Sequence, residues 1–524
     1  MYNFVYSKTT EAYTILNMKS ISHGGIEMAI VAGIDVGTQS TKVICYDTEE
    51  KKILASSQAP HDLISKDDGT REQEAGWWIQ AIQICFQHID SSVRKQISAL
   101  GVSGQQHGFV PLDTQGKVLY PVKLWNDTST TEECEILTRC AGGAEALLQN
   151  EGNLILPGYT APKILWFKRN KPDLYKKLAH IALPHDYINY WLTHTYTMEF
   201  GDASGTALLD ISSRTWSSRL LNCLDSERDL QALLPPLIEA HEPAGFVTKE
   251  AAEQLGIPIG IPVSSGGGDN MMGAIGTGTV QDGTLTMSLG TSGTIYGASD
   301  TPIIDNQGLL AAFCSSTGNW LPLLCTMNCT VASEITRNLF KRDVSSFDQI
   351  AKQAPIGANG VIMLPYFNGE RTPNYPHGNG SIFGFNLQNM TEANINRAAL
   401  ESAIFGLRLG LEAFADLNYQ AKEIRLIGGG AKSPVWRQMV ADICNLPVVI
   451  PTISEAAALG AALQAFWCLE NHSGSGEQID TIVTEHVSLD TKATCEPVEQ
   501  HVDAYAEVYS TYKDYVSLVK PMYT

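Results

Sequence analysis

The stretch that decides the fold is Gly33-Ile34-Asp35-Val36-Gly37-Thr38-Gln39-Ser40-Thr41, and Met287-Ser288-Leu289-Gly290-Thr291-Ser292-Gly293-Thr294 repeats its pattern. In each copy an apolar strand breaks at a Gly-Thr pair and then resumes as a second strand. This pattern indicates a tight hairpin whose glycine lets backbone N–H groups point at a phosphate. The two copies lie about half of the 524-residue chain apart. We therefore predict two related halves that hold a nucleotide between them.

The two copies differ at one chemically important position. Asp35 ends the first strand where the second copy has Ser288. A carboxylate at the end of an apolar strand costs several kcal/mol to bury unless it has a partner. A turn aspartate bonded to local amides is the simpler explanation for an isolated motif. Beside two phosphate hairpins, a carboxylate linked to Mg²⁺ is favoured.

The composition is that of an ordinary globular protein, with 44% hydrophobic and 18% charged residues. The formal net charge is −20, and a polyanionic partner would be repelled at long range. Nucleic acid and anionic membrane surfaces are therefore excluded as main partners. Small sugars and metal-bound nucleotides remain allowed.

The 11 cysteines are odd in number and include no C-x-x-C pair. Such a scattered set is typical of a reduced cytoplasm, so the sequence predicts no disulfide and no zinc site. No stretch approaches the length of a transmembrane helix, and residues 1–28 lack the apolar block of a signal peptide. We expect a cytoplasmic protein with a leader at 1–28 that is disordered, or absent in the cell if translation starts at Met18 or Met28.

Three Gly-rich joints follow predicted strands, at residues 104–108, 266–270 and 428–431. The second and third lead directly into predicted helices. Amides at such joints suit a phosphate or a ribose, although glycine runs often only permit a sharp turn. Neither a Walker A sequence nor G-x-G-x-x-G occurs, which removes the main support for P-loop and Rossmann folds.

Asp269 is the best candidate for a catalytic base. The three glycines before it leave space for a substrate hydroxyl, and the helix start after it is expected to keep the carboxylate ionised. A plain N-cap aspartate is the structural alternative. Phosphoryl transfer needs only a modest base, since positioning does most of the catalysis. His107 is either a ligand contact or a hydrogen-bonded core histidine, and its place in a Gly-flanked loop at a strand end favours the ligand contact.

Eight segments together resemble the FGGY carbohydrate kinases, and within that family the xylulokinases most closely. The matches occur in the family's order and span about residues 29–465: Gly33–Lys42, Ser103–Gly108, Trp125–Asp127, Thr160–Trp166, Gly266–Asn270, Ser288–Gly293, Gly369–Pro373 and Gly428–Ala431. The resemblance implies an α/β fold of two actin-like (ribonuclease H-like) domains with the active site in the cleft between them. It also implies ATP with Mg²⁺ and transfer of the γ-phosphate to a sugar hydroxyl.

The resemblance assigns roles to particular residues. Asp269 and Asp35 match the catalytic and metal-linked aspartates. The sugar would contact Asp269 together with Gln106, His107, Asn126 and Asp127. ATP would contact Gly37, Thr38, Lys42, Gly290, Thr291, Gly429 and Gly430. Two departures from the family pattern concern the sugar: Gln106 stands where methionine is usual, and Ser129 where arginine is usual.

We therefore predict an ATP-dependent pentulose kinase that makes D-xylulose 5-phosphate. A kinase for ribulose, L-xylulose, glycerol or gluconate is the alternative within the class. An actin-like ATPase and a non-catalytic sugar sensor are the alternatives from other classes. The expected division is a leader at 1–28, a sugar-binding domain at 29–275 and a nucleotide-binding domain at 276–524. A homodimer is compatible with the sequence, but nothing in the sequence specifies one.

Overall fold

The first sheet begins with the predicted hairpin and continues as a three-stranded meander. The computed structural model describes residues 29–523, so the expected leader lies outside the described residues. Helix α1 (Ala75–His88) then returns the chain to a strand that runs parallel to the first one. The strand order is β14-β15-β6-β1-β2-β3, with β16 also paired to β6. The strands are β1 (Ile30–Val36), β2 (Ser40–Asp47), β3 (Lys52–Pro60), β6 (Ile97–Gly104), β14 (Pro243–Phe246), β15 (Pro262–Ser264) and β16 (Gly267–Gly268).

The second sheet repeats the pairing of the first. Its order is β19-β18-β17-β22-β23, with two antiparallel pairs followed by two parallel pairs. The same succession joins β3, β2, β1, β6 and β15. The predicted repeat of two related halves is confirmed. The strands are β17 (Thr284–Leu289), β18 (Gly293–Gly297), β19 (Leu323–Thr326), β22 (Glu423–Ile427) and β23 (Val448–Val449).

Helices and short strand pairs surround the first sheet, and many of them lie between β6 and β15. The helices are α2 (Ser91–Arg94), α3 (Thr131–Cys140), α4 (Ala144–Asn150), α5 (Thr160–Asn170), α6 (Pro172–Tyr175), α7 (Pro184–Thr193), α8 (Phe200–Ala203), α9 (Ser218–Leu224), α10 (Lys249–Leu255) and α11 (Asp269–Thr277). The short strands are β4 (Ile64–Ser65), β5 (Arg71–Gln73), β7 (Val110–Leu112), β8 (Val122–Lys123), β9 (His180–Ala182), β10 (Met198–Glu199), β11 (Leu209–Asp210), β12 (Thr215–Trp216) and β13 (Leu237–Ile238).

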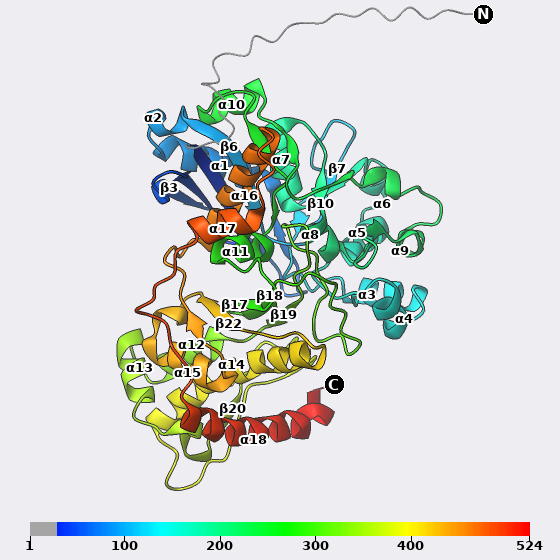
Figure 1. Ribbon diagram of the computed structural model, residues 1–524. Helices are drawn as coiled ribbons and strands as arrows, with labels where there is room; N and C mark the ends of the chain where they lie inside the picture. The colour runs from blue at the N-terminus through cyan, green and yellow to red at the C-terminus, as the bar shows by residue number, and fades with distance from the viewer. Residues whose placement is uncertain (1–28, 524) are drawn as a thin grey trace, which may run out of the picture.

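The second lobe packs its helices around the second sheet, with helix α18 at the far end from the first lobe (Figure 1). Its long helix α14 (Glu392–Asp416) begins where the sequence indicates, with Thr391 as N-cap. Helix α15 (Pro434–Cys444) begins as predicted, since Ser433 accepts a hydrogen bond from the Trp436 amide. The other elements after β19 are α12 (Thr330–Leu339), α13 (Val344–Ala351), β20 (Ile362–Leu364), β21 (Ser381–Phe383), α16 (Ala456–His472), α17 (Ile479–His486) and α18 (Glu499–Tyr523).

Helix α16 comes late in the chain but packs on the first sheet. Figure 1 shows it in orange beside the blue strands of the upper lobe. Residues of α16 join β1, β2 and α11 in one buried cluster. The spatial units are therefore not continuous in sequence, and the boundary at residue 275 stays a prediction.

Glycines bring α16 into backbone contact with its neighbours. A Cβ atom added at Gly33 of β1 would overlap the carbonyl oxygen of Ala458, and one at Gly101 of β6 would overlap that of Ala461. Gly276 of α11 and Gly460 of α16 are enclosed by backbone in the same way. Because the neighbouring atoms are backbone, no side-chain rearrangement relieves such an overlap.

Cys140 and Cys223 form a disulfide, which corrects the prediction that there is none. The two residues are 83 positions apart, and helices α3 and α9 bring their Cα atoms within 5.8 Å. Spacing along the chain carries no sign of this pairing, because it depends on how two helices pack. Between residues 29 and 523 no helix is long and apolar enough to cross a bilayer.

We expect Gly101→Ala to lower the free energy of unfolding by about 1–3 kcal/mol, because the added methyl group forces α16 away from β6. Chemical denaturation measures this change. Gly76→Ala is the matched control, since nothing lies within 4 Å of a Cβ at that exposed helical position. It should leave stability unchanged or raise it by up to ~1 kcal/mol. Equal stability of both variants would contradict the close packing of α16.

Candidate active site

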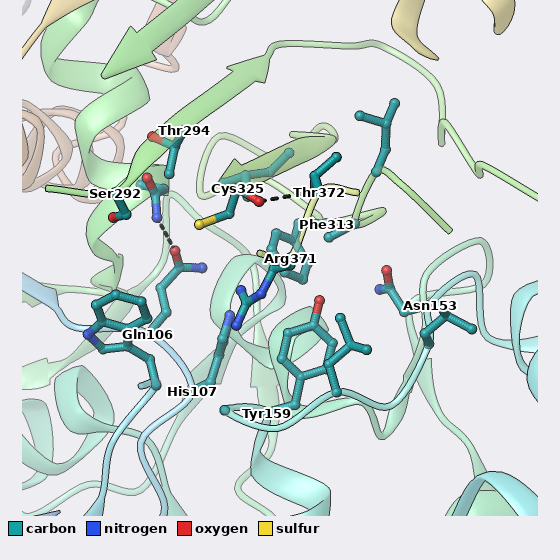
Figure 2. Close-up of a pocket in the computed structure, with 18 of the residues that line it drawn as sticks. Gln106, His107, Asn153, Tyr159, Ser292, Thr294, Phe313, Cys325, Arg371 and Thr372 are labelled. Atoms are coloured by element: carbon teal, nitrogen blue, oxygen red, sulfur yellow. Dashed lines mark hydrogen bonds between the residues drawn. The ribbon is translucent and has the colours of Figure 1, made fainter. Parts of the chain in front are cut away.

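A cavity of about 290 Å³ lies between the two lobes. One wall comes from the loop after β6, the start of α11 and the segment that leads into α5. The other comes from β17, β18, the segment 308–313 and the loop 371–374. Figure 2 shows side chains of both lobes converging on this space. The predicted residues Gln106, His107, Asp269 and Gly290 all line it.

Asp269 is the first residue of α11, directly after β16, which pairs with the end of β6. Gly268 is the N-cap of this helix, so the plain N-cap reading of Asp269 does not hold. A Cβ at Gly268 would crowd the Gln106 side chain, which explains why glycine precedes the aspartate. One carboxylate oxygen of Asp269 accepts a hydrogen bond from Asn270 Nδ2 at 3.2 Å.

The pKa of Asp269 is raised to about 7, chiefly by burial and then by the charges of Asp35 and Asp202. This corrects the expectation that the helix start keeps the carboxylate ionised at low pH. Two backbone N–H groups do lower the pKa, but desolvation and two nearby anions outweigh them. The side chain is therefore poised to take up a proton near neutral pH.

Asp35 is the penultimate residue of β1 and accepts a hydrogen bond from Ser103 Oγ at 2.8 Å. Burial raises its pKa to about 6, although Ser103 and Lys42 act in the opposite direction. Lys42 stands opposite Asp35 in the β1–β2 register, but its ammonium group forms an ion pair with Glu455. The strand therefore presents a half-buried carboxylate, and the lysine opposite it is engaged in an ion pair with Glu455.

Gln106 and His107 form the predicted sugar pair at the end of β6. The Gln106 side chain accepts from Asn270 Nδ2 at 2.5 Å and donates to Met271 Sδ at 3.1 Å. His107 has a left-handed backbone, with φ of 62°, and its Nδ1 lies 3.0 Å from Asp202 Oδ1. Both residues are therefore held by partners outside their own loop.

Asp202, in α8, belongs to a buried chain of charges that the sequence analysis missed. Its Oδ2 lies 3.3 Å from His185 Nδ1, and His185 Nε2 lies 2.9 Å from Asp186 Oδ1. Burial alone would raise the pKa of Asp202, but its contacts with His107 and His185 lower the pKa to about 2. Asp202 thus stays ionised and fixes the His107 ring.

Asn126 and Asp127 do not line the cavity. Asp127 is fully buried, and its carboxylate accepts from the Arg71 amide, the Ser129 hydroxyl and Lys123 Nζ. Ser129, where the family tends to have arginine, thus serves the turn around Asp127. Asn126 has a buried side-chain oxygen with no hydrogen-bond partner among the described residues.

The residues predicted to bind ATP lie at both hairpins and at the third Gly-rich joint. Thr38 accepts a hydrogen bond from Trp125 Nε1 at 3.0 Å, which links the first hairpin to the cavity wall. At the second hairpin, the Gly290 and Thr291 carbonyls accept from amides at the start of α12. At the joint after β22, a Cβ at Gly429 would meet open space, whereas one at Gly430 would overlap Trp436.

The cavity also contains residues to which the sequence analysis gave no role. Tyr159 and Phe313 form an aromatic wall beside His107, with ring centroids 5.2 and 5.4 Å from the imidazole. Arg371 enters from the second lobe (Figure 2). Arg371 lies in the Gly369–Pro373 segment, so the sequence showed the motif but not that the Arg371 side chain points into the cavity.

This fold and site define a phosphotransferase of the carbohydrate kinase type, with two actin-like (ribonuclease H-like) domains and a cleft between them. Residues 30–276 match the N-terminal domain model of the FGGY family of carbohydrate kinases, and residues 285–469 match its C-terminal domain model. The chain belongs to this family. As a kinase of this family, the protein uses ATP as its phosphate donor.

Similar proteins cover nearly the whole chain. A xylulose kinase of Haemophilus influenzae is 43% identical over 492 residues, which cover 93% of this chain and 99% of that protein. A xylulose kinase of Bacillus subtilis is 34% identical over 95% of this chain and 98% of that protein. A crystal structure described as a xyloylose kinase from Brucella ovis superposes with a TM-score of 0.87 at 29% identity, covering 94% of this chain and 100% of that one.

We expect Asp269→Asn to stabilise the protein increasingly as the pH rises. The pKa of aspartate is near 4 in the unfolded chain, whereas that of Asp269 is about 7 in the folded protein. The protonated Asp269 therefore stabilises the folded protein at low pH, and this stabilisation is lost as the pH rises from about 4 to 7. Asparagine never ionises. The melting temperature in EDTA should therefore rise above wild type little at pH 4 and most at pH 8, by the equivalent of ~2–4 kcal/mol.

The exposed Asp67 provides the matched control for this measurement. Asp67→Asn should track wild type across the same pH range. A gain in melting temperature from Asp269→Asn that is equal at pH 4 and pH 8 would contradict the raised pKa.

Proposed function

We propose that this protein transfers the γ-phosphate of ATP to D-xylulose and forms D-xylulose 5-phosphate. The observation that carries the proposal is the half-buried carboxylate of Asp269, whose pKa is raised to about 7 and which lines a cavity walled by both lobes. The names of the relatives support the choice of sugar. Their identity of 34–43% extends over at least 93% of the chain.

In this proposal Asp269 accepts the proton of the sugar hydroxyl as the hydroxyl oxygen bonds to the γ-phosphorus. The bond from that phosphorus to the β-γ bridging oxygen breaks, and ADP leaves. Asn270 orients the Asp269 carboxylate through their 3.2 Å hydrogen bond and also holds Gln106. The base and the sugar pair are thus linked through one amide side chain.

The phosphates of ATP are proposed to contact the two hairpins, at Gly37, Thr38, Gly290 and Thr291. Gly429 and Gly430 are proposed to border the nucleoside, because the open space at Gly429 permits close approach of a ligand. The ammonium group of Lys42 is not free to bind a phosphate, because it forms an ion pair with Glu455. We propose that Lys42 acts by placing that ion pair beside Asp35.

Asp35 and Asp269 fit a role in holding Mg²⁺. The charge of Asp35 raises the pKa of Asp269. A divalent cation held by these carboxylates would offset this repulsion. Magnesium in phosphoryl-transfer sites typically uses one or two carboxylates and completes its shell with phosphate and water. When bound, the ion would neutralise charge on the transferred group.

The cavity walls come from both lobes, so closure around the sugar would exclude water and limit hydrolysis of ATP. This favours a sugar kinase over an ATPase that works without a sugar. A homodimer and a cytoplasmic location stay predictions from the sequence.

ADP release over a panel of sugars tests the proposed function. D-Xylulose should give the highest kcat/KM, at least about tenfold above D-ribulose, L-xylulose, glycerol and gluconate, because unpaired polar groups penalise a poorly matched sugar. A higher kcat/KM with another sugar of the panel would contradict D-xylulose as the substrate but would still support a sugar kinase. ADP release that does not depend on any sugar would contradict the kinase proposal itself.

Asp269→Asn should lower kcat by at least about 10²–10³, because the amide keeps the shape of the side chain and cannot accept the proton. The KM for ATP should change little. Asp67→Asn is again the control and should keep wild-type kinetics. A variant at position 269 that retains most of its kcat would exclude Asp269 as the base.

A further inference from the structure

The loop that carries Arg371 is rigidly anchored to the second lobe. Glu370 is 4% exposed, and its carboxylate accepts hydrogen bonds from the Met327 amide at 2.6 Å and the Arg371 amide at 2.7 Å. Asn328 Nδ2 also donates to Glu370, and Thr372 Oγ1 donates to the Cys325 carbonyl. The backbone at Arg371 is therefore fixed before any ligand arrives.

The Arg371 guanidinium, in contrast, has no hydrogen bond or ion pair with any residue from 29 to 523. It lines the cavity and extends toward His107 and Tyr159 (Figure 2). Its charge acts on both of those residues. A guanidinium carries five N–H donors in a planar fork, and leaving them unpaired in a half-buried cavity is costly. Such a group indicates a ligand that offers oxygen acceptors.

His107 presents the opposite hydrogen-bonding character to the same space. Its Nδ1 lies 3.0 Å from Asp202 Oδ1, and a carboxylate only accepts, so Nδ1 carries the proton. In the neutral ring Nε2 is then an acceptor, and Nε2 has no hydrogen-bond partner within the described part of the chain. Gly205 packs directly against the ring, so that a Cβ at position 205 would overlap the imidazole.

We propose that Arg371 is a sugar-binding residue contributed by the second lobe, and that it donates to sugar oxygens while His107 Nε2 accepts from a sugar hydroxyl. A polyhydroxylated ketose fits this pair, since its oxygens both donate and accept. The inference rests on the proposed function and adds a residue that determines sugar affinity. It also makes the bound sugar a bridge between the lobes.

The position of Arg371 favours the sugar over the transferred phosphoryl group. The guanidinium lies beside His107 and Tyr159, on the side of the aromatic wall (Figure 2). The charges that act most strongly on Asp269 are instead Asp35 and Asp202. Arg371 thus faces the part of the sugar beyond the reacting hydroxyl.

Calorimetric titration with D-xylulose, together with steady-state kinetics, tests the assignment in three variants of the full chain. Arg371→Gln should raise the Kd and KM for D-xylulose about 10- to 100-fold, with the KM for ATP within about twofold of wild type. Arg371→Lys should give a smaller increase, because it keeps the charge but loses the fork. Arg342→Gln, an exposed arginine of the same lobe, is the control and should bind D-xylulose as wild type does.

Two outcomes would overturn the assignment. One is an unchanged Kd for D-xylulose with a lower kcat in Arg371→Gln, which would indicate that Arg371 contacts the transferred phosphoryl group and not the sugar. The other is an unchanged Kd and kcat. Melting temperatures should match wild type, since Arg371 has no protein partner to lose in the described structure. If the panel identifies another sugar, the same titrations with that sugar test Arg371 independently of the proposed substrate.

Discussion

The backbone contact between helix α16 and the first sheet is the constraint on which the site depends. Glycines at positions 33 and 101 let the helix lie directly on β1 and β6, and Gly276 brings α11 against the same helix. The ends of these three elements carry Asp35, the sugar pair and Asp269. A wider spacing between α16 and its neighbours would displace every one of these groups.

The site concentrates negative charge that the protein neutralises only in part. Asp35 and Asp269 both have raised pKa values, with burial as the largest cause. Asp202, close by, is instead held ionised by two histidines. The three carboxylates therefore divide their work: one orients a histidine permanently, and two are unstable as anions until a ligand supplies positive charge. Functional sites commonly carry such a cost in stability.

The sequence was sufficient for the repeat, and it singled out Gln106, His107 and Asp269, which the structure places in the cavity. The hairpins at Gly37 and Gly290 could be predicted because a tight turn needs glycine at one position, and this glycine is visible in the sequence. Asp269 and His107 were found because they follow strands at a sheet edge. Asp202 and Arg371 were not found, because elements distant in the sequence bring Asp202 to His107 and Arg371 to the cavity. Asp127 is the opposite case: the sequence motif pointed to a sugar contact, but the side chain bonds to the turn around it.

The late position of α16 in the chain has a consequence for biosynthesis. The strands and helices up to residue 277 leave the ribosome first, yet one face of their sheet is covered by residues 456–472. Until those residues emerge, apolar positions such as Val31 and Ala99 have no partner helix to cover them. A nascent first lobe is thus an incomplete folding unit that exposes hydrophobic surface until residues 456–472 have emerged, which is the condition under which chains aggregate or require a chaperone.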